Sequence, residues 1–210
     1  MLTFHTIVLF TIACLSINLI PGPDVIYIVS NTMKGRMVAG MKAALGLGVG
    51  YLFHTLAACL GLSALILSSA VAFTAVKWLG AFYLAYLGVK SLYAMYDGQS
   101  TLTISDSGKS SHSNVFKQGV IVSVLNPKVA LFFLSFLPQF IDVSTQNTAE
   151  QLFVLGLWFS VLATLCNVTY AMMGSWLLRS SHAQRFSRVL EGISGGLLLG
   201  LATKIAFSEK

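Results

Sequence analysis

Charged residues are scarce in this chain of 210 residues, where Asp, Glu, Lys and Arg together make up only 10%. Hydrophobic residues make up 56%, and the mean hydropathy is +0.79. Both values lie far from those of a soluble domain of this length. A soluble helical bundle would also need polar helix faces, which the long apolar runs lack. The sequence therefore predicts an all-α protein that crosses a membrane several times.

Features of cofactor sites are also absent. The cysteines are odd in number and show no pairing pattern: Cys14, Cys59 and Cys166. Three of the four histidines are scattered near span ends and loops, which gives no metal constellation: His5, His112 and His182. No glycine-rich segment continues into Gly-Lys-Ser or Gly-Lys-Thr, which excludes an ATP-driven phosphate loop. We expect no metal, no other cofactor, no catalytic residue and no enzymatic activity.

Six apolar runs are long enough to cross a bilayer, since a spanning helix needs roughly 20 residues at about 1.5 Å each. They cover residues 4–33, 38–66, 70–95, 115–140, 151–178 and 189–207. We expect a single transmembrane transporter domain over residues 1–210. Repeat one covers about 1–96, a polar cytoplasmic linker 97–114, and repeat two about 115–210. Three spans in each half give inverted repeats, a recurring design of transporters.

Proline is also rare, and three of the four prolines interrupt apolar runs. Pro21, Gly22 and Pro23 lie within the first run, and Pro127 lies within the fourth, about half the chain length after Pro23. Because proline removes a backbone donor and clashes with the preceding turn, both helices should be broken at membrane depth. Freed backbone groups are tolerated there only when they face protein or water. We therefore predict that the two breaks form a functional site.

A charge follows each of these prolines. Asp24 is the only acidic residue well inside a predicted span, and Lys128 is the only basic residue near the middle of one. Isolated charges at this depth cost about 2.5–3.5 kcal/mol each, so the two should lie near each other or near water. Two roles fit. Lys128 and helix N-termini could bind the carboxylate of a zwitterion whose amino group binds Asp24, or the two residues could form a structural ion pair between the halves.

Other polar residues within the spans are weaker candidates. His54 could relay protons or could be a packing residue. Asn167 and Tyr170 could line a cavity or bond across helices. The residues that we expect to bind substrate or to couple transport are Asn18, Pro21, Gly22, Pro23, Asp24, His54, Asn126, Pro127, Lys128 and Asn167.

The basic residues predict the orientation of the chain. Nine of the thirteen lie in the first, third and fifth loops: Lys34, Arg36, Lys42, Lys90, Lys109, Lys117, Arg179, Arg185 and Arg188. The positive-inside rule then assigns these loops to the cytoplasm and both termini to the periplasm. The net charge of +6 follows from this topology, and we expect no nucleic-acid partner.

The chain resembles the lysine exporter and homoserine/threonine efflux family of bacterial amino-acid exporters over nearly its whole length. The residues that carry the resemblance are Pro21-Gly22-Pro23-Asp24, Gly35-Arg36, Gly40, Gly46, Gly50, His54, Leu79-Gly80-Ala81-Phe82-Tyr83-Leu84, Leu87-Gly88, Asn126-Pro127-Lys128, Phe132-Phe133 and Pro138-Gln139-Phe140. The resemblance implies six spans in the bacterial inner membrane and export of amino acids or close derivatives by proton antiport. Which amino acid is carried, which ion is coupled and whether the protein forms a homodimer stay open.

Two other transport classes use comparable scaffolds. A membrane thiol-electron carrier also has two inverted three-helix halves, but its chemistry needs a reactive cysteine beside each proline. Those positions hold Asp24 and Lys128. The interpretation as a metal-ion exporter is weakened by the lone intramembrane carboxylate and by the lack of Cys and His clusters. A secondary transporter that exports amino acids is the prediction.

Overall fold

The computed structural model describes residues 2–20, 22–62, 70–97, 114–142, 147–179 and 183–206, and within these ranges every regular element is helical. The elements are α1 (Phe4–Leu19), α2 (Pro23–Ala57), the π-helix η1 (Ala58–Leu62), α4 (Ala70–Asp97), α5 (Val115–Val124), α6 (Pro127–Leu131), the π-helix η3 (Phe132–Phe136), the 3₁₀-helix η4 (Leu137–Phe140), α7 (Thr148–Arg179) and α8 (Ala183–Ala206). The expected all-α class is confirmed. Pro21 and most of the predicted linker lie outside the described residues.

Some of the described helices are long and apolar enough to cross a membrane. Two segments, Pro23–Gly61 and Thr148–Gly174, meet this condition alone. A third crossing is obtained if Val115–Val124 and Pro127–Phe140, which are bent by 44°, form one broken span. Helix α1 has only 16 residues because the chain is interrupted after Leu19. The fold is that of a helical membrane protein, and the arrangement as six spans stays a prediction.

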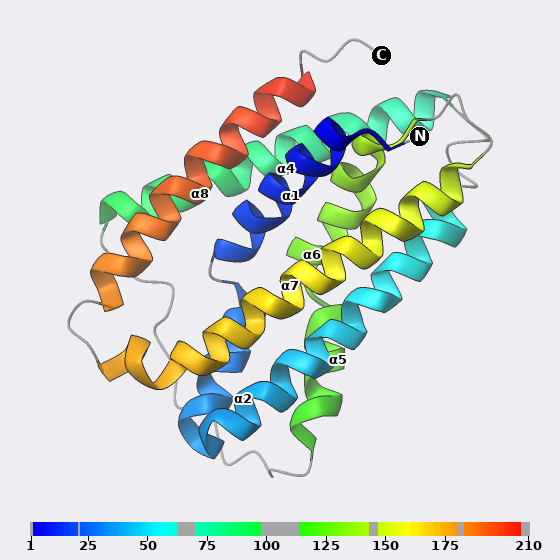
Figure 1. Ribbon diagram of the computed structural model, residues 1–210. Coiled ribbons are helices and arrows are strands. Elements are labelled where there is room, and N and C mark those ends of the chain that lie inside the picture. The colour runs from blue at the N-terminus through cyan, green and yellow to red at the C-terminus, as the bar shows by residue number, and fades with distance from the viewer. Residues whose placement is uncertain are drawn as a thin grey trace.

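Helix α2 consists of two segments that meet at a sharp turn. Gly35 (φ −122°, ψ 20°) and Arg36 (φ 58°, ψ −172°) have non-helical backbone angles. A Cβ atom added to Gly40 would overlap the Thr32 hydroxyl, although eight residues of a straight helix span about 12 Å. The second segment, residues 37–57, therefore folds back beside the first, residues 23–34 (Figure 1). The first predicted loop is thus a tight turn, and Lys42 belongs to a helix.

The helices form two groups. Helix α2 packs against α5 and α7, whereas α4 packs against α8, and α1 contacts both α7 and α8 (Figure 1). The contact between α2 and α5 depends on glycine, because a Cβ atom at Gly46 would overlap the Phe116 carbonyl oxygen. One at Gly119 would lie 2.8 Å from the Ala43 carbonyl oxygen. Small residues let these backbones approach closely.

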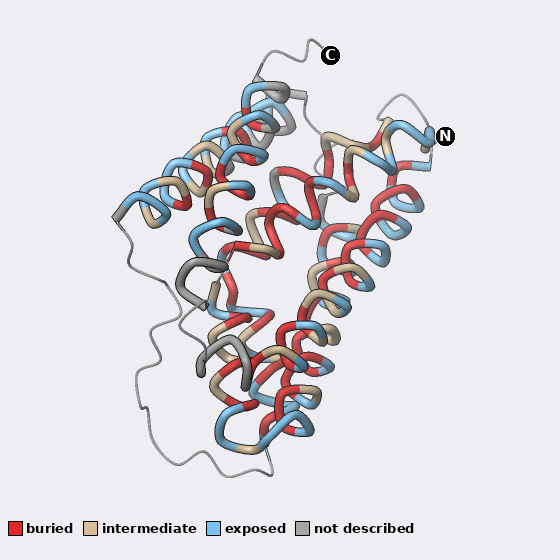
Figure 2. The backbone as a smooth tube through the Cα atoms, turned by 60° about the vertical axis from the view of Figure 1, so that its left-hand side comes forward, coloured by how far each residue is buried: buried red, intermediate tan, exposed pale blue. Residues whose placement is uncertain are grey.

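An aromatic cluster fills the space between the groups. Phe132 of η3 stacks on Phe159 of α7 with ring centroids 4.7 Å apart, and Phe10 of α1 meets Phe140 of η4 at 5.2 Å. Buried residues face the neighbouring helices, while exposed residues lie on the outer surface (Figure 2). That outer surface carries many large apolar side chains, as expected where lipid replaces water.

Glu191 is buried inside helix α8, although it stands near the start of the last apolar run, residues 189–207. Helix α8 begins at Ala183, six residues before the apolar run, so Glu191 lies well within the helix. The residue is only 2% exposed, and Ser91 of α4 donates a hydrogen bond to its backbone carbonyl. The start of the apolar run therefore did not predict where helix α8 begins.

Candidate functional site

The first break follows from two prolines in close succession. A residue that precedes proline is pushed away from helical angles. Ile20, before Pro21, ends α1 with extended angles (φ −72°, ψ 119°), and Gly22, before Pro23, is also extended. Pro23 then occupies the first position of α2, where its missing N–H costs nothing. Asp24 consequently lies in the first turn of α2, where the helix dipole favours a carboxylate.

The second break repeats this arrangement. Asn126, before Pro127, is extended (φ −75°, ψ 109°) and caps α6 by accepting a hydrogen bond from the Lys128 backbone N–H at 3.0 Å. Pro127 again begins the helix, and the charged residue follows at the second position. Both interruptions lie where the sequence predicts them. Pro23 and Pro127 are themselves exposed, and each begins a helix.

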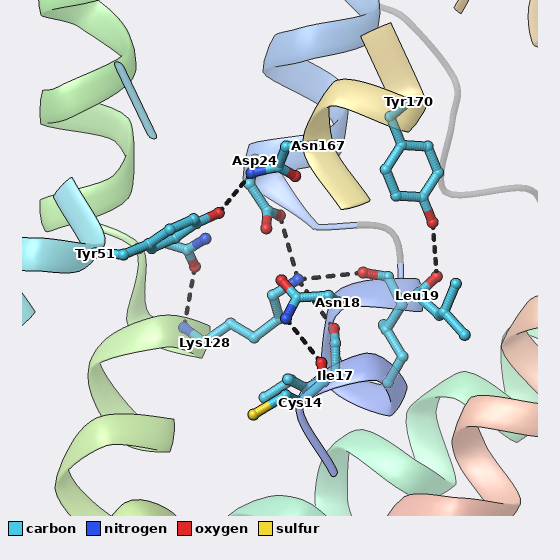
Figure 3. Close-up of polar contacts among 11 residues, drawn as sticks. Cys14, Ile17, Asn18, Leu19, Asp24, Tyr51, Lys128, Asn167 and Tyr170 are labelled. Atoms are coloured by element: carbon cyan, nitrogen blue, oxygen red, sulfur yellow. Dashed lines mark hydrogen bonds and ion pairs between the residues drawn. The ribbon is translucent and has the colours of Figure 1, made fainter. Parts of the chain in front are cut away.

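An ion pair joins the two breaks. The Lys128 Nζ atom lies 3.2 Å from Asp24 Oδ1 (Figure 3), and the two residues are only 6% and 1% exposed. Nζ also donates to the carbonyl oxygens of Ile17 at 3.3 Å and Ile20 at 3.2 Å, at the carboxyl end of α1. An ammonium group has three donors, so all three have acceptors. The negative end of the α1 dipole adds to the attraction.

Asp24 and Asn126 each have one buried polar atom that has no hydrogen-bond partner among the described residues. These atoms are the second carboxylate oxygen of Asp24, Oδ2, and the amide nitrogen of Asn126, Nδ2. Buried polar atoms in folded proteins are nearly always bonded, so such atoms call for an explanation. Asp24 Oδ2 can accept from an ammonium group or carry a proton, and Asn126 Nδ2 can donate to a carboxylate. The site therefore has one acceptor and one donor available for a ligand.

Gly22 leaves space for the ion pair. A Cβ atom at this position would lie 2.8 Å from Asp24 Oδ1 and 2.9 Å from Lys128 Nζ. Both distances are too short for carbon, so a side chain at Gly22 would push the pair apart. The extended backbone at Gly22 suits any residue, which means that this position needs glycine for space.

Two tyrosines from different helices surround the breaks. Asn167 of α7 donates a hydrogen bond to the hydroxyl oxygen of Tyr51 on α2 at 2.8 Å, and both residues are buried. Tyr170, one turn further along α7, donates to the Leu19 carbonyl at 3.2 Å (Figure 3). Helix α7 thus binds both α2 and the free end of α1. Asn167 was expected at the site, whereas Tyr51 was missed because nothing in its apolar surroundings distinguishes it from a core residue.

His54 and Asn18 are used differently. The His54 Nε2–H group donates to the Ser123 carbonyl oxygen at 3.0 Å, just before the second break, and its ring stacks on Phe133. This contact ties α2 to the end of α5, as a packing residue would. Asn18 is buried and donates to the Cys14 carbonyl within its own helix at 2.7 Å.

The residues that could hold a metal do not come together. Within the described ranges, no group of three His, Cys, Asp or Glu side chains is close enough to bind an ion. Cys14, Cys59 and Cys166 are free thiols. The charged groups that the site brings together are the Asp24 carboxylate and the Lys128 ammonium group.

Comparisons with known proteins identify the family of the chain. The chain is 33% identical over 210 residues to the uncharacterized membrane protein YrhP of Bacillus subtilis (strain 168), which covers 97% of this chain and all of the relative. It is 29% identical over 205 residues to the leucine efflux proteins of Salmonella choleraesuis (strain SC-B67) and Salmonella typhimurium (strain LT2), covering 94% of this chain and 92% of each relative. No solved structure matches it. The family model of the LysE type translocator matches residues 15–209, so the chain belongs to the LysE type translocator family.

Proposed function

We propose that this protein is a secondary transporter that exports amino acids or close derivatives across the bacterial inner membrane in exchange for protons. The observation that carries the proposal is the buried Asp24–Lys128 pair between two broken helices, in a chain that belongs to a translocator family. Broken helices at the middle of the membrane are where many transporters bind substrate. The thiol-electron and metal-ion alternatives are not favoured.

The pair suits a zwitterion because each charge of the ligand has an opposite charge at the site. The ammonium group of an amino acid would bind Asp24, using the Oδ2 atom that has no hydrogen-bond partner. Its carboxylate would bind Lys128 and the free Asn126 amide hydrogen atoms. Charge-assisted bonds of this kind are about twice as strong as neutral ones.

Proton exchange follows from the same geometry. Lys128 has all its donors in use in the ion-paired state, so a substrate carboxylate must displace one acceptor. A proton on Asp24 removes the negative charge that holds both Lys128 and the substrate ammonium group. Proton binding and substrate binding therefore compete at Asp24, which is the requirement for antiport.

We further propose that the transported amino acid has an apolar side chain. Relatives of the chain are named leucine efflux proteins, and the residues from Val129 to Phe133 that follow Lys128 are all apolar. Phe132 lies one turn beyond Lys128 and stacks against Phe159 within the buried cluster. An apolar substrate side chain would be compatible with such a surface, whereas a second ammonium group would lack a partner.

The test is uptake by everted membrane vesicles that contain the protein, because export from the cell becomes uptake in this orientation. A growth screen of overexpressing cells against toxic amino-acid analogues would first select the substrate. We expect labelled leucine to accumulate when the vesicle interior is acidic and accumulation to stop when a protonophore is added. Vesicles without the protein provide the background.

Each part of the proposal can fail separately. Transport that is unaffected by the protonophore would contradict proton coupling while leaving amino-acid export intact. Absence of transport for every amino acid in the screen, with the protein inserted in normal amount, would contradict export itself.

Topology is the third part of the proposal, with six spans in two inverted repeats, a cytoplasmic linker and both termini in the periplasm. A reporter fused after Asp97 should report the cytoplasm, and one fused at Lys210 should report the periplasm, because basic residues cluster in the odd-numbered loops. Paired alkaline phosphatase and fluorescent-protein fusions at both positions provide the measurement. The reverse result at both would refute the orientation.

A further inference from the structure

An open cavity lies at the turn of α2, and none of its lining residues belongs to the ion pair. Its volume is about 390 Å³, and it is lined by Lys34, Gly35, Arg36, Val38, Ala39, Lys42 and Val115. Small-ligand pockets have volumes of about 300–1,000 Å³. Three of the seven lining residues are basic, and none is acidic.

Neither Arg36 nor Lys42 forms an ion pair with a described residue, and no acid lies near them in the sequence. The chain contains no Asp or Glu between Asp24 and Asp97, or between Asp106 and Asp142. Asp24 is occupied by Lys128. Arg36 and Lys42 are exposed and converge on the cavity. Like charges held close together are stabilised when an anion binds between them.

The helix ends at the cavity make the local potential more positive. The second segment of α2 begins directly after Arg36, and α5 begins at Val115 without a side-chain cap from Asn114. Each helix N-terminus carries about half a positive charge and is usually balanced by an acid. Helix α5 has no acidic residue in its first turn. An anion in the cavity would balance the cations and both helix ends.

Arg36 supports a ligand role by its backbone. Its angles (φ 58°, ψ −172°) lie in a region that only glycine adopts easily, and it is the one positive-φ residue other than glycine among the described positions. Such strain persists where a side chain is needed for another purpose. Glycine would adopt the backbone angles of this turn more easily. The presence of arginine instead indicates that the guanidinium group has a function.

The rim of the cavity is apolar. Val38 lines it and is 63% exposed, and the neighbouring Met33 and Met37 are more than half exposed. An exposed apolar rim next to a basic pocket suits a ligand with a charged head and a hydrocarbon tail. Basic pockets between membrane helices bind anionic lipid headgroups in this way.

From these observations we infer that the cavity at residues 34–42 binds a phosphate group, with Arg36 and Lys42 as its principal ligands. The phosphate is that of an anionic phospholipid headgroup or of a free phosphate ion, which share this chemistry. Arg36 offers a guanidinium fork that matches phosphate oxygens, and Lys42 adds a point charge. The site is separate from the Asp24–Lys128 pair and does not depend on the transported substrate.

The test uses the purified full-length protein in a neutral detergent. The melting temperature and the apparent dissociation constant are measured while short-chain phosphatidylglycerol, short-chain phosphatidylcholine or inorganic phosphate is added. We expect phosphatidylglycerol to stabilise the wild type and phosphatidylcholine to have no effect. Affinity for phosphatidylglycerol should fall about fivefold in Lys42→Gln and about thirtyfold in the double variant Arg36→Gly, Lys42→Gln.

Lys90→Gln is the matched control, because it also removes one exposed positive charge from the same predicted side of the membrane. It should bind phosphatidylglycerol like the wild type. Arg36→Gly relieves the backbone strain, so the double variant should be at least as stable as the wild type without ligand. Should the double variant nevertheless be unstable, the single variant Lys42→Gln still tests the site.

Each outcome decides the matter. Stabilisation by phosphatidylglycerol alone that is lost in the double variant supports a lipid site, and equal stabilisation by inorganic phosphate supports a free-phosphate site. Equal affinity in wild type and the Arg36 and Lys42 variants, or no stabilisation by either phosphate compound, overturns the inference.

Discussion

Replacing Asp24 by Asn should reduce efflux to the background level while the protein still inserts into the membrane. The change keeps the size of the side chain but removes the charge that holds Lys128. Breaking a buried pair by removing one partner costs about 3–5 kcal/mol, because the other charge is left uncompensated. Here the two carbonyl oxygens of α1 still bind the ammonium group, so the loss of stability should be at the lower end.

Lys128→Met should abolish efflux as well and should reduce the amount of folded protein more strongly. Lys128 Nζ is the hydrogen-bond donor of Asp24 Oδ1, while Oδ2 already has no partner. The buried carboxylate would therefore have to take up a proton or remain unsolvated. The measurement is efflux from preloaded cells, normalised to membrane-inserted protein.

The double variant separates the two roles that the pair could have. If the pair only holds the halves together, replacing both residues removes both stranded charges and should restore expression and activity. If the pair binds substrate or couples protons, the double variant should be well folded and inactive. An active double variant would contradict the substrate role.

Gly46→Ala should strongly destabilise the contact between α2 and α5. Its Cβ atom would overlap the Phe116 carbonyl oxygen, and a backbone atom cannot rotate away. Overpacking of this kind costs roughly 1–3 kcal/mol. Because α2 and α5 carry the two sides of the site, efflux should fall together with the melting temperature. Thermal unfolding in detergent, followed by fluorescence-detected gel filtration, gives the change.

Gly196→Ala provides the matched control. Among the described residues, a Cβ atom at Gly196 in α8 would have no atom within 4 Å apart from its own helix and neighbours. The same substitution should leave packing intact and raise stability slightly, by about 0.5–1 kcal/mol, since alanine is the better helix former. Equal melting temperatures for both variants would show that the close approach of α2 and α5 is not limiting.

The positions of the two breaks followed from the sequence because their causes are local. A proline restricts the residue before it and removes its own hydrogen bond, whatever the rest of the chain does. Ile20, Gly22 and Asn126 accordingly have extended angles beside the three prolines of the breaks. The helical membrane class followed from composition for a similar reason, since a bilayer accepts few charges and requires bonded backbones.

The sequence alone indicates that burying the charges of Asp24 and Lys128 in a membrane costs free energy. Only the tertiary structure shows that the two residues form a contact. They are 104 positions apart, and their contact depends on how α1, α2 and α6 pack. The same holds for the acceptors that α1 offers to Lys128, for the bond between Asn167 and Tyr51, and for the turn at Arg36. Each of these contacts joins groups from different parts of the chain, so the distance between the groups depends on how several helices pack. Local sequence rules, which act over a few residues, cannot predict that packing.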